Sequence, residues 1–129
     1  PRVLIVEDDM PTLEAVVFKL KKKGIHADVA VHGEEALEKI KHGTYKLILL
    51  DLLLPKKNGF EVLEELAKDK KNKKTKIIIF SNLVQKEDIA RAHSLGAHGF
   101  IAKADMSIEK LAERIVDELK GKIERGVAP

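Results

Sequence analysis

The sequence predicts an α/β fold in which five parallel strands alternate with five helices that cover both faces of one sheet. Short runs rich in Val, Ile and Leu recur along the chain, and segments with apolar residues at helical spacing separate them. Parallel strands need long crossover connections, which such helices provide, and these crossovers are right-handed. The run 47–50 (LILL) is apolar without alternation, as is typical of a strand buried on both faces. We therefore predict a doubly wound parallel sheet.

The first half of the chain is expected to hold three strands and two helices. Strands are predicted at 2–6, 25–31 and 47–50, from their β-branched and apolar residues. Pro11 suits the first turn of the helix between the first two strands. Three lysines favour the negative end of that helix, and Gly24 ends it. A second helix is expected at 33–40, with Ala36 and Ile40 facing inward.

The second half repeats the alternation. Helices are predicted at 60–70, at 86–94 and from about Ser107, which is a good N-cap residue. Strands are predicted at 76–80 and 99–102. No linker, internal repeat or low-complexity segment interrupts the pattern, so the 129 residues are expected to form a single domain, with a core at about 2–120 and a carboxyl-terminal tail at 121–129.

The composition excludes several functional classes. There are 24 Lys and Arg against 21 Asp and Glu, and the resulting net charge of +3 is too weak a bias to indicate nucleic acid. With no cysteine, disulfides and thiolate metal sites are excluded. No apolar run approaches the roughly 20 residues of a membrane span, so we expect no membrane partner and a cytoplasmic location.

Polar side chains stand where the expected strands end. Glu7 and Asp8 follow the first strand, Asp51 the third, Ser81 the fourth and Lys103 the fifth. If these strands are neighbours, all five side chains converge on one edge of the sheet, where open α/β folds bind ligands. Clustered carboxylates repel unless a cation lies between them, and carboxylate oxygens suit Mg²⁺. A carboxylate nucleophile, a metal, a lysine and a hydroxyl together suit phosphoryl transfer onto Asp51.

Six lysines crowd the turn between the third helix and the fourth strand. We favour a solvated loop whose lysines suit the end of a helix, and the alternative is a basic contact patch for an acidic partner or nucleic acid. The turn has no interleaved aromatic residues and no recognition-helix pattern, so we expect no direct DNA binding. The lysines are Lys68, Lys70, Lys71, Lys73, Lys74 and Lys76.

Four motifs in this order resemble the receiver domain of response regulators in two-component signalling. They are LIVEDD (4–9), DLLLPKKNG (51–59), IIIFSN (77–82) and GAHGFIAK (96–103). The resemblance covers the whole chain and implies a flavodoxin-like sheet with strand order 2-1-3-4-5. It also implies that the domain takes a phosphoryl group as an aspartyl phosphate from a sensor histidine kinase or a phosphotransfer protein of a phosphorelay.

The resemblance assigns roles by position. Asp51 is the implied phosphoacceptor, and Asp8 the main carboxylate ligand of Mg²⁺, with Mn²⁺ as an alternative ion. Glu7 would act beside Asp8, largely through metal-bound water, and the Leu53 carbonyl would complete the protein ligands.

Three further residues would respond to the phosphoryl group. Ser81 would be the hydroxyl that turns toward it, Phe100 the aromatic that turns inward, and Lys103 the cation that pairs with its oxygens. The face made by the fourth helix, fifth strand and last helix (about 86–120) would be read by a downstream protein or output domain. Homodimerisation through that face stays open, since no residue in the sequence argues for it. The domain would catalyse only its own phosphorylation and dephosphorylation, and would not be an enzyme with a diffusible substrate.

The sequence departs from the family pattern near the site. Ala104 follows Lys103, where the family usually has a proline, so a trans or a strained loop is expected. Asn82 stands where a small residue is usual. Leu53 and Leu83 flank the path of the hydrolytic water in receivers, and neither side chain can orient water, so we expect slow self-dephosphorylation.

Three other functions are considered. A phosphatase with an aspartyl intermediate needs a second acid just after the nucleophile, and Leu52 and Leu53 offer none. A flavin-binding module needs a phosphate-cradling loop after the first strand, where the acids at 7–9 would repel a phosphate. A receiver-like binding module that takes no phosphate stays open as the alternative function, because the usual proline after Lys103 is absent.

Overall fold

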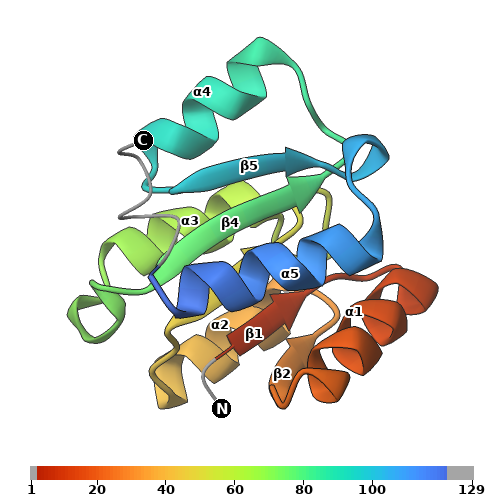
Figure 1. Ribbon diagram of the computed structural model, residues 1–129. Coiled ribbons are helices and arrows are strands. Elements are labelled where there is room, and N and C mark those ends of the chain that lie inside the picture. Colours follow the sequence, from red (N-terminus) through yellow and green to blue (C-terminus); the bar gives the residue numbers. More distant parts are fainter. Residues whose placement is uncertain (1–2, 122–129) are drawn as a thin grey trace.

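The computed structural model describes residues 3–121. Figure 1 shows one parallel five-stranded sheet between two layers of helices, with strand order β2-β1-β3-β4-β5. This arrangement confirms the predicted fold class and strand order. The strands are β1 (Val3–Val6), β2 (Ala27–Ala30), β3 (Leu47–Leu50), β4 (Lys76–Ser81) and β5 (Gly99–Ala102). The helices are α1 (Met10–Lys22), α2 (Gly33–His42), α3 (Gly59–Ala67), α4 (Lys86–Ser94) and α5 (Ile108–Leu119), with 3₁₀ turns η1 (Lys70–Asn72) and η2 (Lys103–Asp105).

The two faces of the sheet bury separate apolar clusters. Alternate residues of each strand point to opposite faces, so Leu4 and Ile48 join the cluster under α2 and α3, whereas Val3 and Leu49 join the cluster under α1 and α5. α4 contributes little to this packing, and its buried residue is Ala92. Figure 1 shows α4 above β5, which is an edge strand of the sheet. The lightly packed helix is therefore the one that follows the Ser81 strand end.

Some element boundaries differ from the prediction. The second strand is shorter than 25–31, because the Ile25 amide donates to Leu20 O and closes α1, while the Val31 amide donates to the Glu35 carboxylate. α2 continues two residues beyond the predicted end, to His42. Arg2 and most of the predicted tail, 122–129, lie outside the described residues. These differences leave the strand ends that carry the candidate site unchanged.

The third helix ends earlier than predicted, at Ala67 instead of residue 70. The Asp69 side chain accepts hydrogen bonds from the Lys71 amide and from the Asn72 side chain, and so holds the chain in the 3₁₀ turn η1. Short polar side chains compete with the helix in this way for backbone groups. The start of the helix is a capping box in which Asn58 and Glu61 exchange hydrogen bonds with each other's backbone amides.

Candidate functional site

Asp51 is the buried centre of the site. It follows β3, its amide donates to Val6 O of the neighbouring β1 at 3.1 Å, and the residue is only 4% exposed. Its Oδ1 accepts hydrogen bonds from the Ser81 hydroxyl at 2.7 Å and from the Leu53 amide at 3.0 Å. Carboxylates are costly to bury without such partners. The residue that the sequence marks as central is therefore held in one orientation.

Gly59 lets the loop after β3 pass close to Asp51. A Cβ at this position would lie 2.5 Å from the Asp51 carbonyl oxygen and 2.6 Å from Leu52 Cα, both backbone atoms that cannot move aside cheaply. The Gly59 amide also donates to Leu52 O at 3.0 Å. The glycine of the DLLLPKKNG motif thus allows α3 to start directly against the strand end that carries Asp51.

Lys103 joins two buried carboxylates. Its Nζ lies 2.8 Å from Asp51 Oδ2 and 2.7 Å from Glu7 Oε1. Burial lowers the pKa of Lys103, but the hydrogen bonds to Asp51 and Glu7 outweigh that effect, so its pKa lies above the ordinary value. Lys103 therefore stays charged at neutral pH and partly neutralises the acidic cluster.

Glu7 is almost completely buried. It is 3% exposed, and it accepts a hydrogen bond from the Asp9 amide as well as the contact with Lys103. Burial raises the pKa of Glu7, while the Lys103 hydrogen bond opposes the rise. Asp9 itself turns away to cap α1, accepting from the amide and the hydroxyl of Thr12.

A cation fits the acidic cluster. One carboxylate oxygen from each of Glu7, Asp8 and Asp51 lies within 4.8 Å of the others. Asp8 is exposed, so the cluster is open to solvent on that side. When ionised, the three carboxylates carry two more negative charges than the Lys103 ammonium balances. An all-oxygen set with room for water suits a hard divalent ion such as Mg²⁺.

Ser81 connects Asp51 to the loop that leads to α4. The Ser81 hydroxyl donates to Asp51 Oδ1, and Ser81 Oγ in turn accepts a hydrogen bond from the Leu83 amide at 3.2 Å. Leu83 is half-buried and packs against the cluster under α2 and α3. The hydroxyl is therefore a direct link between the carboxylate and the backbone that precedes α4.

The side chains of the remaining predicted residues form no hydrogen bond with Asp51. Leu53 is 52% exposed, so its side chain lies open at the mouth of the site while its amide binds Asp51. Phe100 is half-buried on β5 and packs against the cluster under α2 and α3. The peptide bond between Lys103 and Ala104 is trans, as one of the two expected outcomes. The exposed Asn82 directly follows Ser81.

Two features of the site were missed in the sequence. The Phe80 ring centroid lies 5.7 Å from Lys103 Nζ, which gives Lys103 a cation–π contact in addition to its two carboxylate partners. The Leu83 amide, bound to Ser81, carries no side-chain signal at all. Phe80 could have been found, because it precedes Ser81 and pairs with Ile101 of β5, two residues before Lys103.

Comparison with known proteins identifies the family of this chain. The response regulator receiver domain family matches residues 3–116, and the chain belongs to this family. The transcriptional regulatory protein DltR of Streptococcus agalactiae is 37% identical over 111 residues, which are 86% of this chain and 49% of that protein. CiaR of Streptococcus pneumoniae is 38% identical over 121 residues, 92% of this chain and 51% of that protein. The chain thus spans about half the length of these relatives.

Solved structures agree with the fold. A receiver domain protein from Methanospirillum hungatei has a TM-score of 0.85 and 28% identity, covering 96% of this chain and 97% of that one. The receiver domain of the Francisella response regulator 1452 has a TM-score of 0.82 and 31% identity, covering 93% and 97%. Within residues 3–121, no helix has the length and apolarity needed to cross a bilayer.

Proposed function

We propose that this receiver domain accepts a phosphoryl group on Asp51 and transmits its presence through Ser81 to α4. The observation that carries the proposal is the environment of the Asp51 carboxylate. The carboxylate is buried at a strand end and contacts the Lys103 ammonium and the Ser81 hydroxyl. Both groups donate hydrogen bonds and therefore also suit phosphoryl oxygens. Both groups now bind the carboxylate itself, and both can transfer to the oxygens of a phosphoryl group.

The metal in this proposal is Mg²⁺, with Mn²⁺ as a substitute. Asp8 and Asp51 would hold it, together with the Leu53 carbonyl, and Glu7 would act beside them. When bound, the ion supplies positive charge that neutralises the phosphoryl oxygens during transfer. Glu7 also has a second task, because its contact with Lys103 keeps the ammonium beside Asp51.

The transfer itself needs few groups from this chain. An Asp51 carboxylate oxygen attacks the phosphorus of a phosphohistidine on the kinase or phosphotransfer protein. The P–O bond forms as the P–N bond breaks, and the imidazole nitrogen keeps the electron pair. Lys103 stabilises the negative charge on the transferred oxygens. The domain acts on itself in this scheme and has no diffusible substrate of its own.

The response would start at Ser81. The Leu83 amide donates to Ser81 Oγ. When the Ser81 hydroxyl turns from Asp51 to a phosphoryl oxygen, this amide must therefore follow or lose its partner. α4 is lightly packed, so a small shift in this loop can move it. Phe100 turning inward beside α4 would complete the change on the α4–β5–α5 face, where a downstream protein, an output domain or a second copy would bind in the cytoplasm.

Reduction with borohydride tests the assignment. An aspartyl phosphate is an acyl phosphate, which borohydride reduces to homoserine, so the modified position can be found by peptide mass mapping. After treatment with acetyl phosphate and Mg²⁺, we expect homoserine at position 51. Homoserine at position 8 or 9 instead would contradict the role of Asp51.

A further inference from the structure

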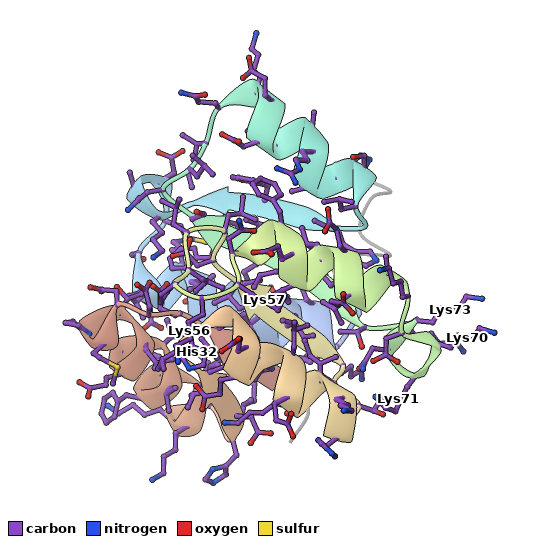
Figure 2. The ribbon with its side chains drawn as sticks, turned by 180° about the vertical axis from the view of Figure 1, so that it is seen from behind. His32, Lys56, Lys57, Lys70, Lys71 and Lys73 are labelled. Atoms are coloured by element: carbon purple, nitrogen blue, oxygen red, sulfur yellow. The ribbon has the colours of Figure 1, made fainter. Side chains whose placement is uncertain are left out.

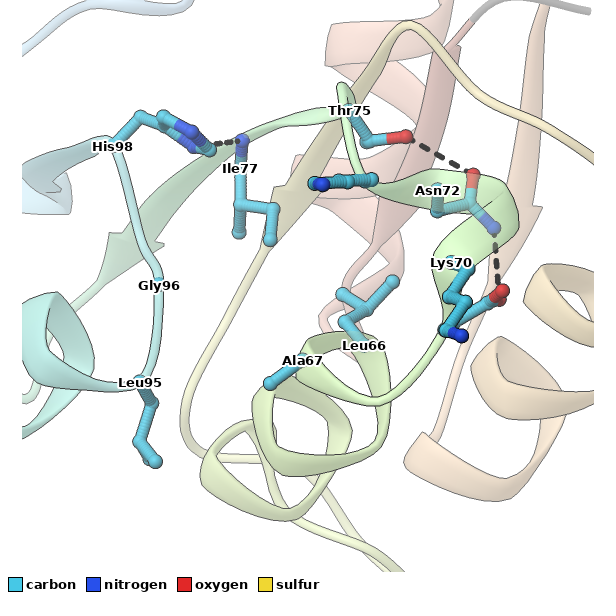
Figure 3. A pocket seen from close by; sticks show the side chains of 11 residues that line it. Leu66, Ala67, Lys70, Asn72, Thr75, Ile77, Leu95, Gly96 and His98 are labelled. Atoms are coloured by element: carbon cyan, nitrogen blue, oxygen red, sulfur yellow. Dashed lines mark hydrogen bonds between the residues drawn. The ribbon is translucent and has the colours of Figure 1, made fainter.

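A cavity lies at the end of the sheet opposite to Asp51. Its volume is about 620 Å³, and it opens between the end of α3, the turn that holds η1, the start of β4 and the turn from α4 to β5. Ile77, at the amino end of β4, belongs to its wall, whereas Ser81 ends the same strand at the phosphoacceptor site. Figure 3 shows this cavity from close by, with Leu66 and Ala67 on one side and Leu95 and His98 on the other.

The base of the cavity is apolar. Leu66 and Ile77 are buried, and the half-buried Leu95 and exposed Ala67 extend the apolar lining toward solvent. His98 adds a polar group beside them. Its Nδ1 accepts a hydrogen bond from the Ile77 amide at 3.0 Å, so the neutral ring carries its hydrogen on Nε2 and keeps one donor.

The lysine-rich turn supplies the charge at the cavity rim. Three of its six lysines have acidic partners, namely Lys68 with Glu65, Lys71 with Asp69 and Lys76 with Glu118. The other three, Lys70, Lys73 and Lys74, form no ion pair with any residue in 3–121. Lys70 and Lys73 line the cavity, and Figure 2 shows both extending outward from the turn. Asp69 also lines the cavity, but Lys71 offsets its charge, so the rim carries the uncompensated positive charge of Lys70 and Lys73.

Most of the lysines in this turn are exposed, as favoured from the sequence, but buried hydrogen bonds hold the turn itself in place. Asn72 is 4% exposed, and its Oδ1 accepts from the Tyr45 amide and from the Thr75 hydroxyl, both at 3.0 Å. Its Nδ2 donates to Asp69 Oδ2 at 3.0 Å and to Gly43 O at 3.3 Å. The turn is thus fixed to the loop before β3, and a ligand would not have to order it.

The chemistry of the cavity selects one class of partner. No Phe, Tyr or Trp among the described residues lines the cavity, and the His98 ring is the one aromatic group among its lining residues, so it offers little surface on which nucleotide bases could stack. Its volume lies within the range of roughly 300–1,000 Å³ that is usual for specific binding sites. Its unpaired ammonium groups favour carboxylates, and its base favours an aliphatic or aromatic side chain.

We propose that this cavity binds an acidic peptide segment of a partner protein. One apolar side chain of the segment inserts between Leu66 and Leu95, and flanking carboxylates contact Lys70 and Lys73. The surface is separate from the phosphoacceptor site and from the exposed face of α4, so binding does not require phosphorylation of Asp51. It is a second contact surface of the domain, fixed before the partner arrives.

Fluorescence anisotropy with a labelled probe peptide tests the proposal. The probe is a short peptide in which one Phe is flanked on both sides by Asp and Glu. We expect saturable binding that weakens at high salt, and a loss of about tenfold or more in affinity in the double variant Lys70→Glu/Lys73→Glu. The control, Lys21→Glu/Lys110→Glu, changes the net charge equally at exposed positions of α1 and α5 and should bind as wild type does.

Two further arms separate the cavity from general charge attraction. Ala67→Trp fills the cavity from an exposed position and leaves the net charge unchanged, so it should also weaken binding of the probe peptide. Asp51→Asn should bind the probe peptide as the wild type does. Binding of the probe is thereby tested separately from the phosphoacceptor role of Asp51. Equal losses in both lysine variants, no effect of Ala67→Trp, tighter binding of a single-stranded oligonucleotide, or no saturation below about 1 mM would each overturn the proposal.

Discussion

Lys103 reaches across the end of β4 to place its Nζ 2.8 Å from Oδ2 of Asp51, although β5 and β3 are not neighbours in the sheet. The 3₁₀ turn at Lys103–Asp105 starts at this residue, directly after β5. The contact with Glu7 at 2.7 Å fixes the ammonium from the other side. Residues from the ends of three strands thus meet at one positive charge, and we expect the stability of the domain without metal to depend on it.

Removal of that charge should destabilise the domain. In Lys103→Met, Glu7 and Asp51 are left buried and adjacent without a cation, and breaking a buried pair in this way costs about 3 kcal/mol. We expect a loss of that order in the free energy of unfolding measured with urea in the absence of divalent ions. Addition of Mg²⁺ should recover part of it. Lys110→Met on the exposed side of α5 is the control, and an equal loss there would contradict the account.

Replacement of Ser81 should uncouple the loop from the carboxylate. In Ser81→Ala the Leu83 amide loses its acceptor, so its hydrogen exchange should accelerate relative to the wild type while amides within β3 keep their protection. Ser81→Thr keeps the hydroxyl and should restore protection at Leu83. If the Leu83 amide exchanges equally in all three proteins, the hydroxyl does not hold this loop.

The lifetime of the phosphoryl group should be long in the wild type and shorter in a polar variant. Leu53 lies exposed at the mouth of the site, and Leu83 is half-buried beside Ser81. Neither can orient water. Leu53→Asn/Leu83→Glu should raise the rate of dephosphorylation about tenfold, a barrier change of roughly 1.4 kcal/mol. Decay of the phosphorylated mass after removal of the donor measures it, and an unchanged lifetime would refute the idea.

The Asp69 turn should contribute stability that depends on pH. The hydrogen bond from Asn72, with smaller contributions from Lys71, lowers the pKa of Asp69 in the folded state. A depressed folded-state pKa means that this stabilisation is complete above the unfolded value of 3.8 and is lost as the pH falls through the folded value. The stability difference between wild type and Asp69→Asn should therefore shrink on acidification below about pH 4. A stability difference between the two proteins that stays constant down to pH 2 would contradict this role of Asp69.

The convergence of Glu7, Asp51, Ser81 and Lys103 follows from the sequence, because parallel strands present their carboxyl ends at one edge. The contacts within that edge do not. Ser81 Oγ binds the Leu83 amide, and Lys103 bridges two carboxylates, through side-chain torsions and loop geometry that no residue pattern encodes. Their positions could be predicted, but their partners could not.

The end of α3 shows the same limit at the level of the fold. Apolar spacing and helix formers favour continuation through residue 70, and the helix period alone contains no reason to stop at Ala67. One cause is local, because the Asp69 side chain accepts a hydrogen bond from the Lys71 amide. The other is tertiary, since Asn72 is bound to Tyr45 and Gly43 of another loop. By contrast, the capping box of Asn58 and Glu61 was readable from the sequence and was overlooked.

Intact mass after incubation with acetyl phosphate and Mg²⁺ shows whether Asp51 accepts a phosphoryl group. Wild type and Asp51→Asn are treated side by side, with and without a chelator. The account predicts the mass of one added phosphoryl group in the wild type only, and its absence when the metal is chelated. No gain in the wild type would indicate a receiver-like module that signals by binding alone, and an equal gain in Asp51→Asn would assign the phosphoryl group to another residue.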